Sequence, residues 1–159
     1  MNRIHCWTIV ALVTCVPLSG FAADSGLTTV PSKHSAEETI HHFEAAISAG
    51  SDQGWMVFTE LDHAAAAKQN GLELRARTVI VFGNPRLGTP SMQKAPTLAI
   101  DVPSKAVVWQ DDQGNVWLTY NSGEYLQGYV YPRHGLPSNP TAAKAFDDLL
   151  KHAAEQATE

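Results

Sequence analysis

The chain has 159 residues and a mass of 17.2 kDa, and 44% of its residues are hydrophobic, 17% charged and 8% aromatic. These proportions are typical of one globular domain, and they exclude a disordered tail, a collagen, a coiled coil and a disulfide scaffold. The net charge of −5 lacks the excess of basic residues that nucleic-acid binders carry, so we expect no nucleic-acid partner.

Residues 1–22 have the pattern of a bacterial secretory signal peptide. A short positive start with Arg3 precedes an apolar run from Ile9 to Leu18, and small residues follow. We place the cleavage after Ala22, because a cut one residue later would put bulky Phe21 three residues before it. A membrane span needs about 20 apolar residues, more than this run offers, and an uncleaved anchor is the alternative. We therefore expect a periplasmic or secreted protein with no membrane anchor after cleavage.

Both cysteines, Cys6 and Cys15, lie in this leader, so the mature chain would have no disulfide, thiolate nucleophile or cysteine-based metal site. The run ending at Cys15 resembles a lipoprotein signal only loosely, because Thr14 stands where a small residue is expected. Residues 23–159 then form a single domain, long enough to bury about two-thirds of its unfolded surface.

The mature chain begins with a predicted strand over Leu27–Val30 and an amphipathic helix. Ser35 and Glu38 have the spacing of a capping box, and Gly50 ends the helix. The apolar positions of that helix recur every three or four residues: Ala36, Ile40, Phe43 and Ile47.

A strand over Trp55–Leu61 follows, and Asp62 then has the position of an N-cap for a short helix that stops at Gly71. Alternating residues predict a further strand over Leu74–Phe82. The segment Gly83–Pro90 is expected to be a turn-rich loop.

Thr89 is the predicted N-cap of the next short helix, which Pro96 must kink or end. Two strands, Lys105–Gln110 and Val116–Asn121, form a predicted hairpin. The segment Glu124–Tyr131 is ambiguous.

Asn139 and Pro140 begin a last helix with apolar Phe146 and Leu150. The predicted order is strand, helix, four strands, helix. A single antiparallel sheet with the helices packed on one face would bury these apolar positions, which is an α+β fold.

Several motifs resemble domain-of-unknown-function family 302, from about Leu27 to Tyr125. The matching segments are Asp62–Ala65, Gly71–Arg75, Phe82–Pro85, Gly88–Gln93 and Val116–Tyr120. The resemblance implies a TATA-binding-protein-like fold and a homodimer. It implies no DNA binding and no established activity, so no catalytic residue is carried over. The segment Gln127–Gly135 departs from the family's simpler joint, and it could fold over a site or reach the dimer partner.

Asp62 and His63 could act together as an acid–base pair, although Asp62 already has a structural role as an N-cap. The loop before Pro90 could bind an anion, with Asn84, Thr89 and Met92 along its rim. Its alternative is a plain strand-to-helix turn.

Aromatic residues of the hairpin could line a ligand pocket, fill the core or form a dimer contact. They are Trp109, Trp117 and Tyr120, which Trp55 and Phe58 could join.

Histidines give only a weak metal signal. His41 and His42 lie four residues after Glu37 and Glu38, but on the solvent side of their helix. His34, His63 and His134 could hold a soft metal together with Met56 and Met92, although core packing explains the methionines as well.

The interpretation we favour is an exported, non-catalytic binding or accessory module for a small-molecule or protein ligand. One alternative is an acid–base enzyme that uses His63 or His134 with Asp62 or Asp101. A weaker alternative is a histidine–methionine metal carrier. No catalytic residue, metal ligand or cofactor is assigned. The candidate ligand-binding residues are Asp62, His63, Asn84, Thr89, Met92, Tyr120 and His134.

Overall fold

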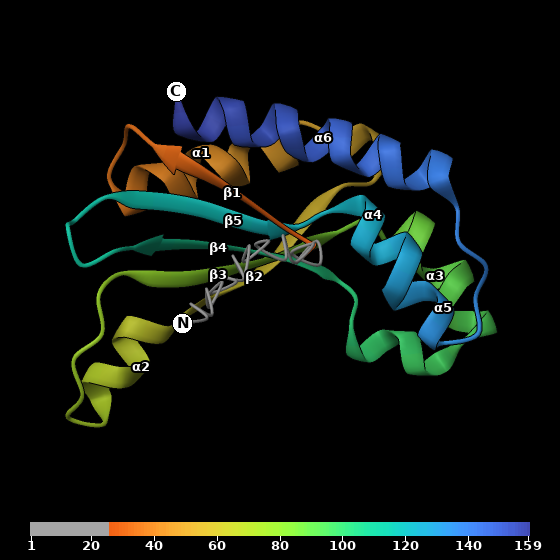
Figure 1. The fold of residues 1–159 in the computed structure, drawn as a ribbon, viewed down its shortest axis with the longest axis horizontal. Helices are drawn as coiled ribbons and strands as arrows, with labels where there is room; N and C mark the ends of the chain where they lie inside the picture. Colours follow the sequence, from red (N-terminus) through yellow and green to blue (C-terminus); the bar gives the residue numbers. More distant parts are fainter. Residues whose placement is uncertain (1–25) are drawn as a thin grey trace, which may run out of the picture.

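A computed structural model describes residues 26–159, and the predicted leader lies outside them. Five strands form one antiparallel sheet in the order β1-β5-β4-β3-β2 (Figure 1). The strands are β1 (Leu27–Ser32), β2 (Met56–Asp62), β3 (Arg77–Gly83), β4 (Ser104–Gln110) and β5 (Val116–Asn121).

Two long helices, α1 (Ala36–Ser48) and α6 (Pro140–Thr158), lie side by side over one face of the sheet (Figure 1). Shorter helices lie at its two ends, with α2 at one end and α3 and α5 at the other (Figure 1). The predicted α+β fold with its element order is therefore confirmed. The shorter elements are η1 (Ser51–Gln53), α2 (His63–Gln69), α3 (Pro85–Lys94), η2 (Pro96–Ile100), α4 (Gly123–Tyr125), η3 (Leu126–Val130) and α5 (Tyr131–Arg133).

The core lies between the two long helices and the sheet face that they cover. Phe43 of α1 meets Phe82 of β3 edge to face at 5.5 Å, and Phe146 of α6 stacks on the same ring at 6.4 Å. Because alternate residues of a strand point to opposite faces, the buried side chains mark the covered face. Fully buried members of this core include Phe43, Ile47, Ile80, Phe82, Val108, Leu118 and Leu150.

A second, smaller apolar cluster holds the α3 end of the molecule together. Its buried members are Ala95, Leu98, Leu126 and Val130, from η2, its flanking residue and η3. The segment 127–135, for which we considered a loop over a site or toward a dimer partner, is largely helical and packs on η2.

The predicted helix starts are confirmed at three positions. Ser35 and Glu38 form the capping box, with the Glu38 amide donating to Ser35 Oγ at 3.2 Å and the Ser35 amide to Glu38 Oε2 at 3.0 Å. Asp62 caps α2 and Asn139 caps α6 through their side-chain oxygens. Each cap satisfies a backbone donor that the first turn leaves free.

Two local predictions were wrong. The helix after β3 begins at Pro85 and continues through Pro90, because Asn84 and Pro85 supply an earlier N-cap and first-turn proline than Thr89 and Pro90. Strand β3 begins at Arg77 and not at Leu74. The reason is that β2 turns into α2 after its last pair with β3, so the preceding residues have no partner strand on that side.

None of the helices that the structure describes in residues 26–159 is long and apolar enough to cross a membrane.

Candidate functional site

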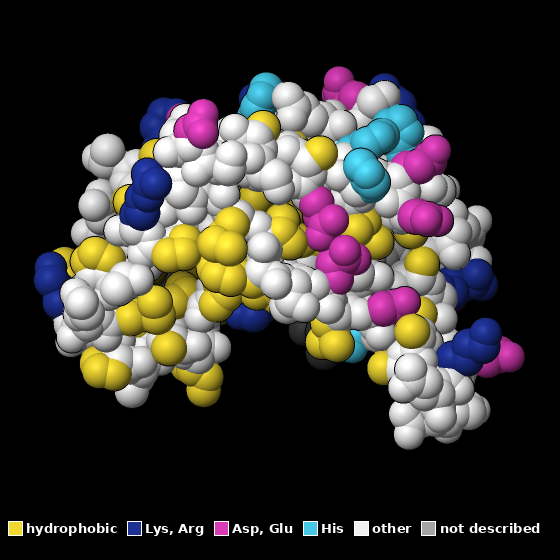
Figure 2. Space-filling model, turned by 180° about the vertical axis from the view of Figure 1, so that it is seen from behind, with side chains coloured by type: hydrophobic (Ala, Val, Ile, Leu, Met, Phe, Trp, Pro, Cys, Tyr) yellow, Lys and Arg dark blue, Asp and Glu magenta, His cyan; other side chains and the backbone are white. Residues whose placement is uncertain are grey.

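The face of the sheet opposite α1 and α6 carries two rows of side chains. One row runs across four strands as Pro31, Trp117, Trp109 and Arg77, which are paired in register. Thr29, Thr119, Val107, Val79 and Leu61 form the neighbouring row. The molecule is hollowed on this side, between its α2 end and its α3 end (Figure 2). We call this surface the open face.

Two stacked tryptophans, Trp109 and Trp117, form a platform on the open face. Trp109 and Trp117 stack with ring centroids 6.0 Å apart and planes inclined by 22°. Trp109 Nε1 donates to Thr119 Oγ1 at 2.9 Å, and Trp117 Nε1 donates to Asp111 Oδ2 at 2.9 Å. Both indole donors are used within the chain, so what the platform offers a ligand is apolar ring surface.

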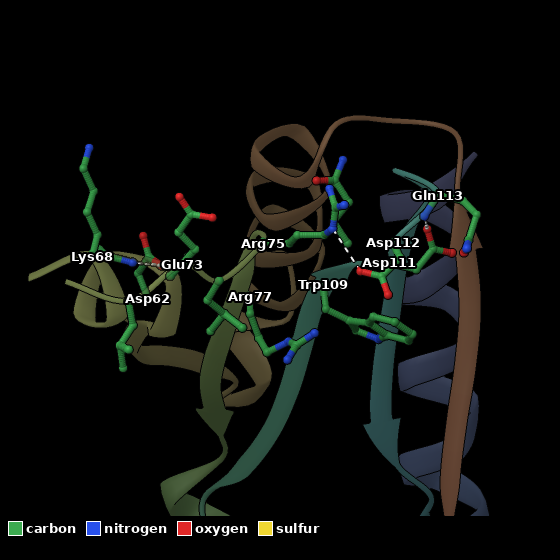
Figure 3. Close-up of a pocket in the computed structure, with 14 residues that line it drawn as sticks. Asp62, Lys68, Glu73, Arg75, Arg77, Trp109, Asp111, Asp112 and Gln113 are labelled. Atoms are coloured by element: carbon green, nitrogen blue, oxygen red, sulfur yellow. Dashed lines mark hydrogen bonds and ion pairs between the residues drawn. The ribbon is translucent and has the colours of Figure 1, made fainter. Parts of the chain in front are cut away.

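A groove of about 1160 Å³ lies at the α2 end of the open face. Its walls come from the start of α2, the segment 72–75 and the turn between β4 and β5, while Arg77 and Trp109 belong to its floor (Figure 3). Small-molecule sites occupy roughly 300–1,000 Å³, so this groove has room for a ligand of drug-like size.

Most carboxylates in the groove are engaged by their own neighbours. Asp111 accepts hydrogen bonds from the amides of Gln113 and Asn115, from the Asn115 side chain and from the Trp117 indole, at 2.8–3.0 Å. These bonds, above all those from the side chains of Asn115 and Trp117, lower the pKa of Asp111 to about 2. Asp62 is used as the cap of α2.

The cationic groups of the groove differ in their partners. Arg75 Nε lies 3.2 Å from Asp112 Oδ1, and both side chains are well exposed. The Arg77 side chain is more buried and makes no hydrogen bond or ion pair with any of residues 26–159. The side chains of Lys68 and Glu73 also lack such a partner among the described residues, but they are exposed on the α2 side (Figure 3).

The sequence-predicted site residues are dispersed. Asp62 lines the groove as well as capping α2, and His63 is the exposed first residue of that helix. Tyr120 points to the covered face, where it is 6% exposed in the main core, so it does not join the tryptophans of the open face.

The three residues expected along the rim of a loop have separate environments. Asn84 accepts from the Arg86 amide at 3.0 Å and donates to the Gln53 carbonyl at 3.0 Å, which are structural contacts. Thr89 is exposed on α3, and Met92 packs on the second cluster. The segment predicted as an anion-binding loop is therefore the first part of helix α3, and it does not bring these three side chains to one site.

One candidate pair from the sequence is brought together. His134 Nε2 lies 2.5 Å from Asp101 Oδ2, and Thr97 Oγ1 lies 2.8 Å from His134 Nδ1. Arg133 also donates to Asp101, at 2.7 Å. An ionised carboxylate only accepts, so Nε2 of His134 donates to Asp101, while Nδ1 and the Thr97 hydroxyl share the second hydrogen bond. The hydrogen bond from His134, followed by the charge of Arg133, lowers the pKa of Asp101.

The histidines of α1 lie only partly on the solvent side. His41 is exposed, whereas Nδ1 of His42 is buried with no hydrogen-bond partner among the described residues, and the His34 ring meets His42 at 4.9 Å. Within residues 26–159 no group of three or more His, Cys, Asp or Glu side chains is arranged to hold a metal ion.

Arg77 is the site residue that sequence reasoning missed. Its signal was present: an arginine on the strand face that continues as Val79 and Val81, where a charge is out of place. Its pairing with Trp109 depends on the register of β3 and β4, which the sequence did not specify.

The fold and the groove define a small α+β domain whose sheet is covered by two helices on one face and carries a ligand-sized groove on the other. The chain belongs to the family described as "Domain of unknown function DUF302", whose family model matches residues 28–157. The resemblance inferred from the sequence motifs is confirmed.

Curated relatives carry a similar segment within longer chains. The chain is 44% identical over 124 residues, 77% of its length, to proteins of Brucella named "Fluoride-specific ion channel FluC 1". It covers 46% of the protein of Brucella suis biovar 1 (strain 1330) and 43% of that of Brucella abortus biovar 1 (strain 9-941). The chain thus spans less than half the length of these relatives.

A solved structure shares the fold. It is the crystal structure of an uncharacterized conserved protein DUF302 from Bacillus stearothermophilus, with a TM-score of 0.66 and 17% sequence identity. The similarity covers 84% of this chain and 98% of that one. At this identity it shows the fold alone.

Proposed function

We propose that the chain is an exported, non-catalytic binding module that holds a small-molecule ligand in the groove on its open face. The observation that carries the proposal is the tryptophan platform. Trp109 lines a hollow of about 1160 Å³ and Trp117 stacks on it, and the N–H groups of both indoles are already satisfied. Concave, largely preformed sites with a few polar groups are the usual form of small-molecule sites.

Native mass spectrometry of the mature chain, isolated gently from the exported fraction, tests this proposal. We expect extra mass that disappears on denaturation. Ala64→Trp should abolish it, because Ala64 lines the groove and an indole there would fill it. Ala66→Trp on the same helix is the matched control, since Ala66 is exposed outside the groove, and it should keep the ligand. No extra mass in any of the three proteins, or equal loss in both variants, contradicts the proposal.

The export part of the proposal rests on the pattern of residues 1–22. N-terminal sequencing of the protein from a bacterial periplasmic fraction should start at Ala23. Finding the protein in the cytoplasmic fraction with residues 1–22 still attached would contradict export.

An accessory role at the membrane is supported by the Brucella relatives, which contain a segment similar to this chain and are named as fluoride-specific ion channels. We propose that the module assists such a partner. Fluoride efflux from vesicles that hold the Brucella protein should change when the segment matching this chain is deleted. Unchanged efflux contradicts the accessory role.

The homodimer is part of the same proposal. Light scattering of the mature protein after size exclusion should give twice the mass of the chain, and a monomer mass would contradict the dimer.

An acid–base enzyme is the second candidate, favoured by the contact between His134 and Asp101. His134 is only 7% exposed and both of its nitrogens are engaged, so its one route to a substrate is through the Thr97 hydroxyl. Hydrolysis of p-nitrophenyl acetate should then fall in His134→Ala and in Thr97→Val. Rates equal to those of the unmodified protein in both variants contradict this candidate.

A further inference from the structure

We propose that the groove binds a small organic anion with a single acidic group, such as a carboxylate or sulfonate, on a flat apolar body. In this site Arg77 binds the acidic group and Trp109 contacts the apolar body. The inference rests on the proposed binding function and deepens it by naming the class of ligand.

The position of Arg77 is the first observation. Arg77 lies directly opposite Trp109 in the pairing of β3 with β4, so both side chains belong to the floor of the groove. Figure 3 shows the guanidinium beside the indole. Strand pairing fixes the two backbones, so this arrangement exists before a ligand arrives, and a preformed site loses little entropy on binding.

The unmet hydrogen-bonding capacity of Arg77 is the second observation. The side chain is partly buried and has no hydrogen-bond or ion-pair partner in residues 26–159. A guanidinium has five N–H donors, and withdrawing a charge from water without a partner is unfavourable. A bidentate contact with an acidic group would satisfy this side chain.

The neighbouring carboxylates do not take this role. Asp62 is bonded to the first turn of α2, Asp111 to the hairpin turn and to Trp117, and Asp112 to Arg75. Arg75 extends away from the floor toward Asp112, whereas Arg77 stays beside Trp109 (Figure 3). Arg77 is therefore the arginine of the groove that is available to a ligand.

The overall charge of the groove limits the ligand to one acidic group. Its lining has three cationic side chains, Lys68, Arg75 and Arg77, and four carboxylates, so its formal net charge is −1. A polyanion would meet the carboxylates of the rim, while a single acidic group can reach Arg77 alone. The apolar part of such a ligand would meet Trp109 and the leucines of the groove wall, Leu72 and Leu74.

Two dyes that differ only in the acidic group test the inference. 1-Anilinonaphthalene-8-sulfonate carries a sulfonate, and N-phenyl-1-naphthylamine has the same rings without it. Binding to the folded mature chain is followed by the quenching of tryptophan emission. Arg77→Gln should weaken binding of the sulfonate dye about 10-fold or more, the size of one charge-assisted contact, and leave binding of the neutral dye within about 2-fold.

Arg75→Gln is the matched control, because it removes the same charge from the same groove. It should change the affinity of either dye by less than about 3-fold, as expected of an exposed charge that is screened by solvent. Thermal melting of each variant checks that the fold is kept.

The outcomes separate this inference from the proposed function. If both dyes bind and Arg77→Gln weakens the binding of both equally, or of neither, the binding function stands but the proposal that Arg77 forms an anion site is wrong. If Arg75→Gln and Arg77→Gln weaken binding of the sulfonate dye to the same extent, the loss comes from the overall charge of the groove and the inference is wrong. If neither dye binds and Ala64→Trp alters no bound mass, the proposed function itself fails.

Discussion

Replacing Asp101 with alanine removes the acceptor that joins the end of η2 to the end of α5. In the native protein the carboxylate binds His134 Nε2 at 2.5 Å and Arg133 Nη2 at 2.7 Å. The His134 side chain is 7% exposed, so its N–H would lose its partner where water has little access. Such a group costs about 1–3 kcal/mol, and the half-exposed Arg133 contact adds less than about 1 kcal/mol.

The assay is urea unfolding at pH 7 followed by circular dichroism. Asp148→Ala is the matched control, because Asp148 is paired with Lys144 on the exposed side of α6 and its loss should cost under about 0.5 kcal/mol. A free energy of unfolding for Asp101→Ala within about 0.5 kcal/mol of that control would refute the role of the cluster in stability.

The pH dependence of the same variant gives a second test. His134 and Arg133 lower the pKa of Asp101 below its ordinary 3.8, so the contribution of the carboxylate is present above 3.8. It is lost as pH falls through the lower pKa of the folded state. The stabilities of the unmodified protein and of Asp101→Ala should therefore converge in acid, and a constant gap down to pH 2 would contradict this explanation.

Three further changes test local features by chemical or thermal unfolding. Asp62→Ala should lower the free energy of unfolding by about 1 kcal/mol through loss of the α2 cap while leaving dye binding in place, and no loss contradicts the capping role. Asp111→Ala should lower the melting temperature at pH 7, and this difference should shrink as pH falls from 3.8 toward the native pKa of about 2. A difference that persists at pH 2 would contradict a stabilising role for the Asp111 carboxylate. Gly123→Ala should destabilise by about 1–3 kcal/mol because a new Cβ would collide with the Ala143 carbonyl. Gly128→Ala, where nothing lies within 4 Å, is its control, and equal effects would refute the close approach.

The parts of the fold that were predictable depend on local chemistry. The capping box at Ser35, the N-caps at Asp62 and Asn139 and the hairpin of β4 and β5 each follow from a few adjacent residues. The hydrogen bonds of the caps are made within one helical turn, and the hairpin strands are adjacent in the sequence, so the sequence nearby contains the information needed.

The start of α3 shows where local reasoning becomes insufficient. Two cap-and-proline pairs, Asn84 with Pro85 and Thr89 with Pro90, are equally plausible in sequence. The end of β3 at Gly83 and the contact of Asn84 with the Gln53 carbonyl select the first pair. These are tertiary contacts between distant segments.

The candidate site depended even more on long-range pairing. The sequence placed Trp109, Trp117 and Tyr120 together as hairpin aromatics, but alternation sends Tyr120 to the core and both tryptophans to the open face. Arg77 joins the tryptophans through the order of the strands in the sheet. The contact of His134 with Asp101 likewise needs segments 33 residues apart to pack. The sequence named both as candidate partners, and only the fold brought them together.

The binding groove is the central claim, and an amide NMR titration of the mature chain with 1-anilinonaphthalene-8-sulfonate tests it most directly. We expect the largest shift changes at residues 62–77 and 109–113, which surround Arg77 and Trp109, with small changes over α1 and α6. Shift changes concentrated on the long helices, or around Asp101 and His134, would show that the ligand binds elsewhere and would contradict the claim.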